Sequence, residues 1–296
     1  MQRERTFSIV DVFTDHKYAG NQLAVFRDAG SIPDNEMPQI AREINFSETT
    51  FILSDDPKDG GYDVRIFTPG SEVPFAGHPT LGTAYVIQRD IVREPVDTVV
   101  LNLKVGQIPV RFTYANGDPD FLWMETKPAQ FGSRFDVEPI AEALSIRSSD
   151  IDERFPVQEV STGLPFIITP LKSLNAVKNA RVVRDVFFDM IENTEAKAIL
   201  VFCPETVRDE NQLHARVFVD YYGIPEDPAT GSANSCLAGY LVKYGYFGEN
   251  RIDVRVEQGY EIGRPSLLLL RAEDAAGELK IQVGGQVVMV AKGEFV

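Results

Sequence analysis

The stretch His78-Pro79-Thr80-Leu81-Gly82-Thr83-Ala84 returns later in the chain as Asp227-Pro228-Ala229-Thr230-Gly231-Ser232-Ala233. The proline, the glycine and the last alanine match in place, and the two prolines lie 228 − 79 = 149 residues apart in a chain of 296. The first position changes from histidine to aspartate. A repeat at about half the chain length predicts a duplicated scaffold. Its two halves are expected to supply different groups to one shared site.

The residues that precede each stretch also match. Arg65-Ile66-Phe67 is similar to Arg216-Val217-Phe218, and Val73-Pro74 is similar to Ile224-Pro225, both at a separation of 216 − 65 = 151 residues. Ordered flanks at nearly one period favour duplication over a chance match. Each copy therefore predicts a strand, a loop, the repeated stretch and then a helix.

The two helices that follow the repeated stretches are expected to be buried. The first has no charged residue before Arg89, and the second has none from Pro228 to Val242. A helix that is apolar nearly all round belongs in a core. Two such helices among short strands favour an α+β fold, in which each half wraps a mostly antiparallel sheet around its own helix. The turn at Asn116-Gly117-Asp118 places the expected halves at 1–117 and 118–284.

Local signals place the remaining elements. Ser31 or Asp34 is expected to cap a helix that runs to about Glu43, and Pro79 is expected to be the first residue of its helix. Another helix is expected at 183–193. Runs rich in β-branched and aromatic residues predict strands at 7–13, 23–26, 63–67, 98–104, 108–114, 120–126, 157–160, 166–169, 198–202, 213–219, 251–257, 266–271, 279–283 and 287–292.

Charge and apolar patterning narrow the choice of partners. The formal net charge of −15 argues against nucleic acid or an anionic membrane surface as the main partner, although solubility alone explains such a charge. The chain contains no signal-like apolar run and no stretch of about 20 apolar residues. We therefore expect a cytoplasmic protein without membrane association.

The residues that commonly hold metals and cofactors are sparse. The only cysteines, Cys203 and Cys236, do not make a disulfide framework, and core packing is the role expected of both. The three histidines form no HExxH or Cys/His cluster, so no metal site is expected. The motifs GxGxxG, GxxxxGK[ST] and GxSxG are also missing, and no cofactor is expected.

The start of each predicted helix is a candidate binding site for a small carboxylate. First-turn backbone N–H groups and the positive end of the helix dipole favour anions. Gly82 and Gly231 are expected to allow close approach of a ligand, and Thr83 and Ser232 to add hydroxyl donors. If the two halves face each other, the two helix starts converge on one cleft.

Three side chains form a candidate acid/base set. Glu48 enters an apolar strand, where a carboxylate is less usual than on the surface, and it becomes the natural proton carrier if burial raises its pKa. His78 and Asp227 are expected to polarise the substrate or hold it by hydrogen bonds. The alternative for Asp227 is a helix cap ahead of Pro228. Histidine is a poor cap, which favours a functional role for His78.

The whole chain resembles the PhzF (phenazine biosynthesis-like) family. The resemblance rests on an ordered set of motifs: Gly20-Asn21, Asn45-Phe46-Ser47-Glu48-Thr49, Phe67-Thr68-Pro69, Pro74-Phe75-Ala76-Gly77-His78-Pro79, Glu226-Asp227-Pro228-Ala229-Thr230-Gly231-Ser232-Ala233, Gln258-Gly259 and Gly263-Arg264-Pro265-Ser266. It implies a diaminopimelate epimerase-like fold of two pseudo-symmetric halves, each a barrel-like sheet around a central helix. It also implies a homodimer, and a last strand, at about 285–296, that returns to the N-terminal half.

The resemblance implies a cofactor-independent isomerase similar to those acting on trans-2,3-dihydro-3-hydroxyanthranilate. Two alternatives stay open: a non-catalytic small-molecule binding protein on the same scaffold, and an amino-acid epimerase, which is disfavoured because no cysteine pair replaces the histidine and the aspartate. Asn21 matches the family more weakly than the other site positions do. Those positions are Glu48, His78 and Asp227 as catalytic residues, and Ser47, Gly77, Gly231 and Ser232 as substrate contacts.

Overall fold

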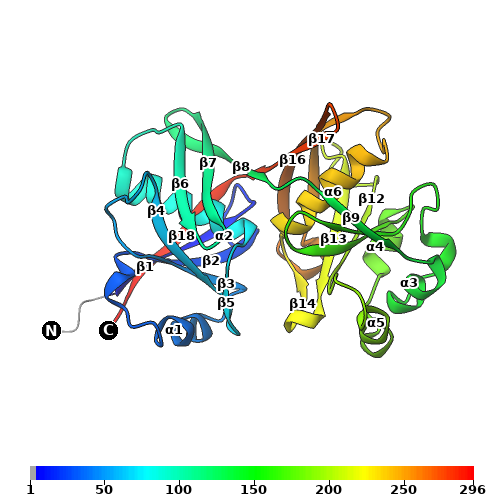
Figure 1. Cartoon of the computed structure of the whole chain (residues 1–296), viewed down its shortest axis with the longest axis horizontal. Coiled ribbons are helices and arrows are strands. Elements are labelled where there is room, and N and C mark those ends of the chain that lie inside the picture. The colour runs from blue at the N-terminus through cyan, green and yellow to red at the C-terminus, as the bar shows by residue number, and fades with distance from the viewer. Residues whose placement is uncertain (1–4) are drawn as a thin grey trace. The chain divides into compact units, whose positions relative to one another are not determined.

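The structure is a computed structural model that describes residues 5–296 (Figure 1). The chain divides into two compact units. The first comprises the described residues up to Glu125 together with Gly284–Val296, and the second comprises Thr126–Val283. The Asn116-Gly117 turn joins β7 (Gly106–Ala115) to β8 (Asp118–Thr126), and the chain leaves the first unit only near the end of β8. A tight turn marks the reversal of a hairpin, and both strands of that hairpin pair within one sheet.

The first unit is a mixed sheet wrapped around one helix. Strand β1 pairs antiparallel with β2 and with β18, β2 runs parallel to β3, and β3 pairs antiparallel with β4. Strand β4 then pairs antiparallel with β5 and parallel with β6, and β6, β7 and β8 follow as an antiparallel meander. The elements are β1 (Arg5–Val12), β2 (Asn21–Phe26), α1 (Met37–Ile44), β3 (Glu48–Ile52), β4 (Tyr62–Phe67), β5 (Glu72–Val73), α2 (Gly77–Val86) with a π-helical continuation (Ile87–Val92), β6 (Thr98–Leu103), β7, β8 and β18 (Val287–Phe295).

The second unit repeats this pattern of pairing. Strand β10 pairs antiparallel with β9 and β11, β11 runs parallel to β12, and β12 pairs antiparallel with β13. Strand β13 pairs antiparallel with β14 and parallel with β15, which pairs antiparallel with β16. The elements are β9 (Gln130–Arg134), α3 (Val137–Ala143), β10 (Gln158–Ser161), β11 (Pro165–Pro170), α4 (Leu174–Asn179), α5 (Arg184–Ile191), β12 (Ile199–Cys203), β13 (Leu213–Val219), β14 (Ile224–Asp227), α6 (Gly231–Lys243), β15 (Arg251–Gln258), β16 (Ser266–Ala275) and β17 (Glu278–Gly285).

The shared order extends to individual side chains. The guanidinium of Arg65 on β4 makes a bidentate contact with the carboxylate of Glu72 on β5, with N–O distances of 2.9 and 3.0 Å. Arg216 on β13 makes the same contact with Glu226 on β14, at 3.0 and 2.7 Å. Each guanidinium also lies over the phenylalanine two residues further along its own strand. These matched contacts support the duplicated scaffold predicted from the repeat.

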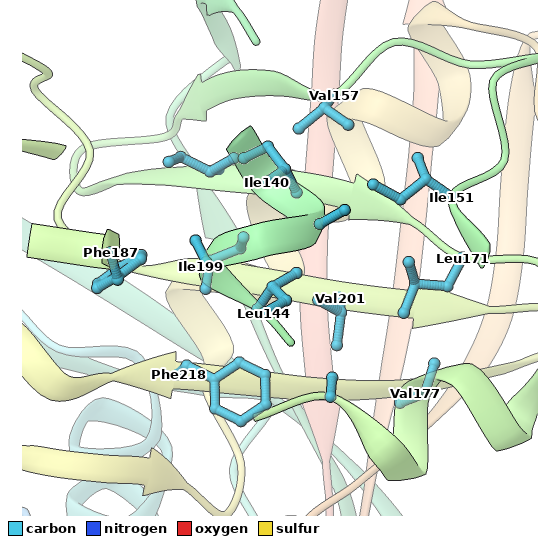
Figure 2. Packing of buried hydrophobic residues seen from close by; sticks show 14 of the residues in the cluster. Ile140, Leu144, Ile151, Val157, Leu171, Val177, Phe187, Ile199, Val201 and Phe218 are labelled. Carbon is cyan, nitrogen blue, oxygen red and sulfur yellow. The ribbon is translucent and has the colours of Figure 1, made fainter. Parts of the chain in front are cut away.

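The central helix of each unit is buried, as the absence of charge predicts. Every residue of α2 is buried, and in α6 all but Ser232 and Lys243 are. In the second unit, β12 is covered on both faces, which explains its unbroken apolar sequence Ile-Leu-Val-Phe-Cys. Ile199 and Val201 face the cluster under α3 and α5 (Figure 2), whereas Phe202 contacts Tyr240 of α6 with ring centroids 6.0 Å apart.

The fold class is confirmed as α+β, and most strand pairs in each unit are antiparallel. In the part of the chain that the structure describes, no helix is both long and apolar enough to cross a membrane.

Three predicted helix starts are wrong. Helix α1 begins at Met37, after a short 3-10 helix at Ala29–Ser31, and Asp34 instead pairs with Arg65 at 2.5 Å. Helix α2 begins at Gly77, so Pro79 is its third residue, a position where the missing N–H still costs no hydrogen bond. Helix α6 begins at Gly231 rather than at Pro228.

Candidate functional site

In the first unit, Glu48 and His78 meet at the end of the buried helix. Glu48 is the first residue of β3 and lies opposite Leu23 of the parallel strand β2. His78 is the second residue of α2. The Nε2 atom of His78 and the Oε2 atom of Glu48 are 3.4 Å apart, and the two side chains are 5% and 17% exposed. The structure thus brings together the predicted proton carrier and the predicted histidine.

His78 is a neutral imidazole at physiological pH. Burial lowers the pKa of His78 to about 3, and a hydrogen bond with the backbone of Gln22 opposes that effect only in part. A neutral ring has one N–H and one acceptor nitrogen. The Nε2 atom makes no hydrogen bond within the described residues, whereas the ring does bond to the backbone of Gln22. We therefore assign the N–H to Nδ1, which leaves Nε2 as an acceptor that faces Glu48.

The predicted ligand-contacting residues of the first unit surround this pair in the sequence. Ser47 immediately precedes Glu48 and is half-buried, and Gly77 immediately precedes His78 and is buried. Asn21 is 1% exposed at the start of β2, next to the Gln22 that bonds His78. The glycine before Asn21 has φ +64°, and a Cβ there would lie 2.3 Å from the carbonyl oxygen of Val12. This turn therefore requires glycine.

Two predicted ligand contacts in the first repeated stretch are wrong. The hydroxyl of Thr83 is buried and shares a 2.8 Å hydrogen bond with Thr50, so it serves the core. A Cβ at Gly82 would lie 2.7 Å from Leu23 Cδ2 and 2.9 Å from Val12 Cγ2. The close approach at Gly82 is therefore between the helix and its own sheet. Sequence spacing alone does not tell which face of a helix meets the sheet.

In the second unit, Asp227 ends a strand and caps no helix. It is the last residue of β14, lies opposite Val217, and is 8% exposed. The cap position of α6 belongs to Thr230, whose hydroxyl donates a 2.5 Å hydrogen bond to Asp227 Oδ2. The capping alternative is therefore wrong. The repeated stretches also differ locally, because the first is helical from Gly77 and the second becomes helical only at Gly231.

Gly231 and Ser232 are the first two residues of α6. Gly231 is buried and Ser232 is half-buried. The carbonyl of Ser232 accepts a 2.7 Å hydrogen bond from the Ser235 hydroxyl. With 13 residues, α6 has a full dipole, and its positive end lies at these two amides. A helix start of this kind favours an anion.

Sequence reasoning missed the residues that hold Asp227. Gln258, at the end of β15, is fully buried and donates a 2.8 Å hydrogen bond to the Asp227 carbonyl oxygen. It also bonds Thr230 and Asn234. The available signal was the Gln258-Gly259 motif, because a glycine can mark a turn in which the backbone approaches a neighbouring segment closely. Gly259 has φ +78°, and a Cβ there would lie 2.5 Å from the carbonyl oxygen of Pro228.

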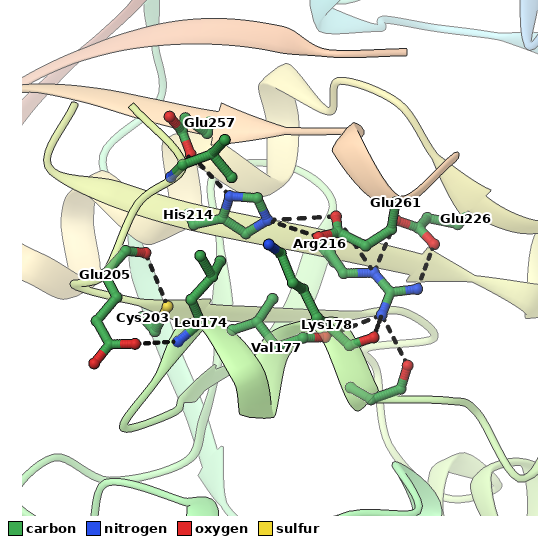
Figure 3. A network of polar contacts seen from close by, with 12 residues as sticks. Leu174, Val177, Lys178, Cys203, Glu205, His214, Arg216, Glu226, Glu257 and Glu261 are labelled. Atoms are coloured by element: carbon green, nitrogen blue, oxygen red, sulfur yellow. Dashed lines mark hydrogen bonds and ion pairs between the residues drawn. The ribbon is translucent and has the colours of Figure 1, made fainter. Parts of the chain in front are cut away.

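The second unit also contains a buried charge network that no sequence pattern predicted (Figure 3). His214 is fully buried between Glu257 at 2.9 Å and Glu261 at 3.1 Å. Burial acts to lower the pKa of His214, but the hydrogen bonds to both glutamates outweigh it and raise the pKa. Arg216 lies beside them, bound to Glu226. Each of these carboxylates has a cationic partner within the second unit. We therefore interpret the network as one that stabilises the fold of that unit.

Neither cysteine is poised for chemistry, in line with the predicted core packing. Both are buried and unbridged, and burial raises the pKa of Cys203 and of Cys236 to about 12. A thiol with so high a pKa carries almost no thiolate at neutral pH. Among residues 5–296, no group of three or more His, Cys, Asp or Glu side chains is arranged to hold a metal ion.

Comparison with known proteins places this chain in a family. A sequence profile of the PhzC-PhzF family, described as phenazine biosynthesis-like protein, matches residues 10–293. The trans-2,3-dihydro-3-hydroxyanthranilate isomerase of Pseudomonas fluorescens is 34% identical over 299 residues, which cover 98% of this chain and 99% of that protein. An uncharacterized isomerase of Clostridium acetobutylicum is 33% identical over 306 residues, covering 100% and 99% of the two chains.

A solved structure agrees with the sequence comparison. The crystal structure of a phenazine biosynthesis protein of the PhzF family from Bacillus anthracis matches this structure with a TM-score of 0.91 at 27% identity, over 100% of both chains. The matches in sequence and in fold both run from one end of the chain to the other. The protein therefore belongs to the PhzF (phenazine biosynthesis-like) family of isomerases.

Proposed function

We propose that this isomerase moves a proton within a small carboxylate-bearing metabolite without a cofactor, and that Glu48 carries the proton. The single observation that supports this role most is the 3.4 Å approach of Glu48 Oε2 to His78 Nε2 at the end of a buried helix. A carboxyl group beside a neutral imidazole in a largely water-free setting suits general acid/base catalysis.

The proposed reaction balances with one proton. Glu48 as carboxylate takes a proton from a substrate carbon, so a C–H bond breaks and an O–H bond forms. The electron pair of that C–H bond forms a new C=C bond, and the adjacent C=C bond of the substrate breaks, so that its electrons become available at the carbon that is protonated next. Glu48 then returns the proton at a different carbon, which restores the carboxylate. Between the two steps, the O–H of Glu48 faces the acceptor Nε2 of His78. His78 thereby stabilises the protonated intermediate without itself becoming charged.

Asp227, Gly231 and Ser232 are proposed to bind the substrate. The start of α6 suits a carboxylate, and the buried Asp227 suits a hydroxyl or amino group that donates to it. Relatives that act on trans-2,3-dihydro-3-hydroxyanthranilate support a substrate with these groups. Ser47, Gly77 and Asn21 are proposed as further contacts, because they adjoin Glu48, His78 and the Gln22 that bonds His78.

Replacing Glu48 with Gln tests the proton carrier. The amide keeps the size of the side chain but cannot accept and return a proton, so kcat is expected to fall by about 100-fold or more. Binding is expected to change little. The assay follows turnover of trans-2,3-dihydro-3-hydroxyanthranilate and, by mass spectrometry, deuterium uptake from D2O over a panel of cyclic and amino-acid carboxylates. Wild-type turnover in the Glu48→Gln variant would rule out the proposed role.

The same panel separates the alternatives. A compound that binds in calorimetry but never exchanges hydrogen would favour a binding protein on this scaffold. Deuterium at the α-carbon of an amino acid would favour an epimerase. We also propose a homodimer in the cytoplasm, as the family resemblance implies. Sedimentation and cell fractionation test these two points.

A further inference from the structure

Gln258 lies at the centre of the hydrogen bonds around Asp227. Its side chain is fully buried, and the two atoms of its amide make four hydrogen bonds. The Nε2 atom donates to the Asp227 carbonyl oxygen at 2.8 Å and to Thr230 Oγ1 at 3.1 Å. The Oε1 atom accepts from Asn234 Nδ2 at 2.8 Å and from the Thr230 backbone N–H at 3.3 Å.

These bonds allow only one orientation of the amide. If the nitrogen and oxygen of Gln258 changed places, the NH2 group would face two donors, the Thr230 N–H and the Asn234 NH2, and the oxygen would face the Asp227 carbonyl. Asn234 is itself held, because its Nδ2 also donates to the Thr230 carbonyl oxygen at 3.0 Å. The direction of every bond in the set therefore follows from donor and acceptor chemistry.

The fixed amide determines what Thr230 does. Thr230 Oγ1 accepts from Gln258, so its own proton is directed at Asp227 Oδ2, 2.5 Å away. Asp227 Oδ2 must then act as an acceptor, which holds the carboxyl group in one rotation. The backbone of Asp227 is tied to the same amide through its carbonyl oxygen. Gln258 thus acts on Asp227 from both the backbone and the side chain.

We propose that Gln258 is a positioning residue that, through Thr230, orients the Asp227 carboxylate toward the substrate. This inference rests on the proposed function, in which Asp227 binds substrate. The glycine at 259 fits the same role, because it lets the end of β15 approach Pro228 closely enough for Gln258 to reach both ends of the turn 227–230.

A purely structural role is the competing explanation, and a matched pair of variants separates the two. Gln158, on β10 of the same unit, is also buried; its Nε2 donates to the Gly132 carbonyl oxygen at 2.9 Å, and it accepts from the Tyr244 hydroxyl. Gln158→Leu removes a buried amide that does not bond Asp227. Gln258→Leu removes the buried amide that bonds Asp227. Both are expected to lower the melting temperature.

The effect on activity is measured as kcat in steady-state kinetics with trans-2,3-dihydro-3-hydroxyanthranilate. Gln258→Leu is expected to lower kcat on the order of 100-fold, because a misplaced group can cost that much, whereas Gln158→Leu keeps the wild-type kcat. Thr230→Val keeps Gln258 and the volume of residue 230 but removes the hydroxyl, and is expected to show the same loss. Thr230→Ser restores the hydroxyl and should recover most of it. Equal loss in the Gln158 and Gln258 variants, or no loss in Thr230→Val, overturns the proposal.

Crystal structures of the folded variants give a readout that needs no substrate. In Gln258→Leu, the Thr230 hydroxyl is expected to leave Asp227 Oδ2 and the carboxyl group to rotate. Retention of that hydrogen bond overturns the positioning role, whatever the kinetics. If the wild-type protein turns over no compound of the panel, the proposed function fails. The position of the Asp227 carboxyl group in the Gln258→Leu crystal structure still tests the positioning role.

Discussion

At the scale of single residues, the site depends on polar groups whose partners are fixed by burial. His78 is neutral because desolvation disfavours its charged form. The hydrogen bond to Gln22 fixes the N–H on Nδ1, so the nitrogen that faces Glu48 is the acceptor Nε2. His214 has the opposite balance, because two glutamates favour its charged form. The two histidines therefore respond to pH in opposite directions.

We expect His78 to make the first unit less stable in mild acid. The pKa of His78 is about 3 in the folded protein, below the ordinary 6.5, so the unfolded chain binds more protons between these values. The stability that the neutral ring contributes is complete above pH 6.5 and is lost as the pH falls toward 3. Between pH 7 and pH 5, the loss attributable to this residue is about 2 kcal/mol.

Urea unfolding at several pH values, followed by the fluorescence of Trp123, measures this effect. Trp123 is the only tryptophan and lies on β8 of the first unit. His78→Asn is expected to flatten the pH dependence between 7 and 5. His16→Asn changes an exposed histidine of the same unit and serves as the control. A steep dependence that survives in His78→Asn would contradict the assignment.

At the scale of elements, each unit joins its strand hairpin with the same arginine–glutamate contact but in a different setting. Arg65 is 24% exposed and Glu72 is 17% exposed. Arg216 is 5% exposed and Glu226 is 7% exposed. Arg216 also donates to the carbonyl oxygens of Val177 and Ala180 at the end of α4, at 3.0 and 2.8 Å. The second copy of the contact therefore ties β13, β14 and α4 together.

Matched substitutions should show how much burial changes the contribution of the arginine–glutamate contact to the free energy of unfolding. Arg216→Met is expected to cost about 3–5 kcal/mol in the free energy of unfolding of the second unit, because it leaves Glu226 buried without its cation. Arg65→Met is expected to cost about 1 kcal/mol or less in the first unit, where water reaches the pair. Denaturant unfolding of both variants measures the difference. Equal costs would contradict this account.

At the scale of the whole molecule, the last strand of the chain completes the first unit. Strand β18 pairs with β1 from Arg5–Phe295 to Val12–Val287, and Figure 1 shows β18, in red, beside β1. Phe295 packs edge-on against Phe7 and Phe26, with ring centroids 5.3 Å apart in both pairs. The first unit is therefore built from both ends of the sequence. The second unit is continuous from Thr126 to Val283.

Deleting residues 287–296 should unfold the first unit and spare the second. The deletion removes the partner of β1 and exposes the phenylalanine cluster that Phe295 covers. We expect loss of the Trp123 unfolding transition, with the second unit still giving a cooperative transition by circular dichroism. Deleting Val296 alone, which lies beyond β18 and is fully exposed, is the control. A first unit that unfolds normally without β18 would contradict this reading.

The sequence by itself determined the repeat, the two buried helices, the α+β class and the family, together with Glu48 and His78 as candidates. The helices and the fold class rest on periodicity and on the absence of charge, which act within short segments. The family rests on its resemblance to an ordered set of motifs, and the two candidates rest on their residue types and their places in the chain. Tertiary structure alone decided that α6 starts at Gly231, that Thr83 bonds Thr50 and that Gln258 holds Asp227. The physical reason is the range of the interactions. A buried polar group must find a partner, and Gln258 reaches Thr230 and Asp227 across 28 and 31 residues of sequence.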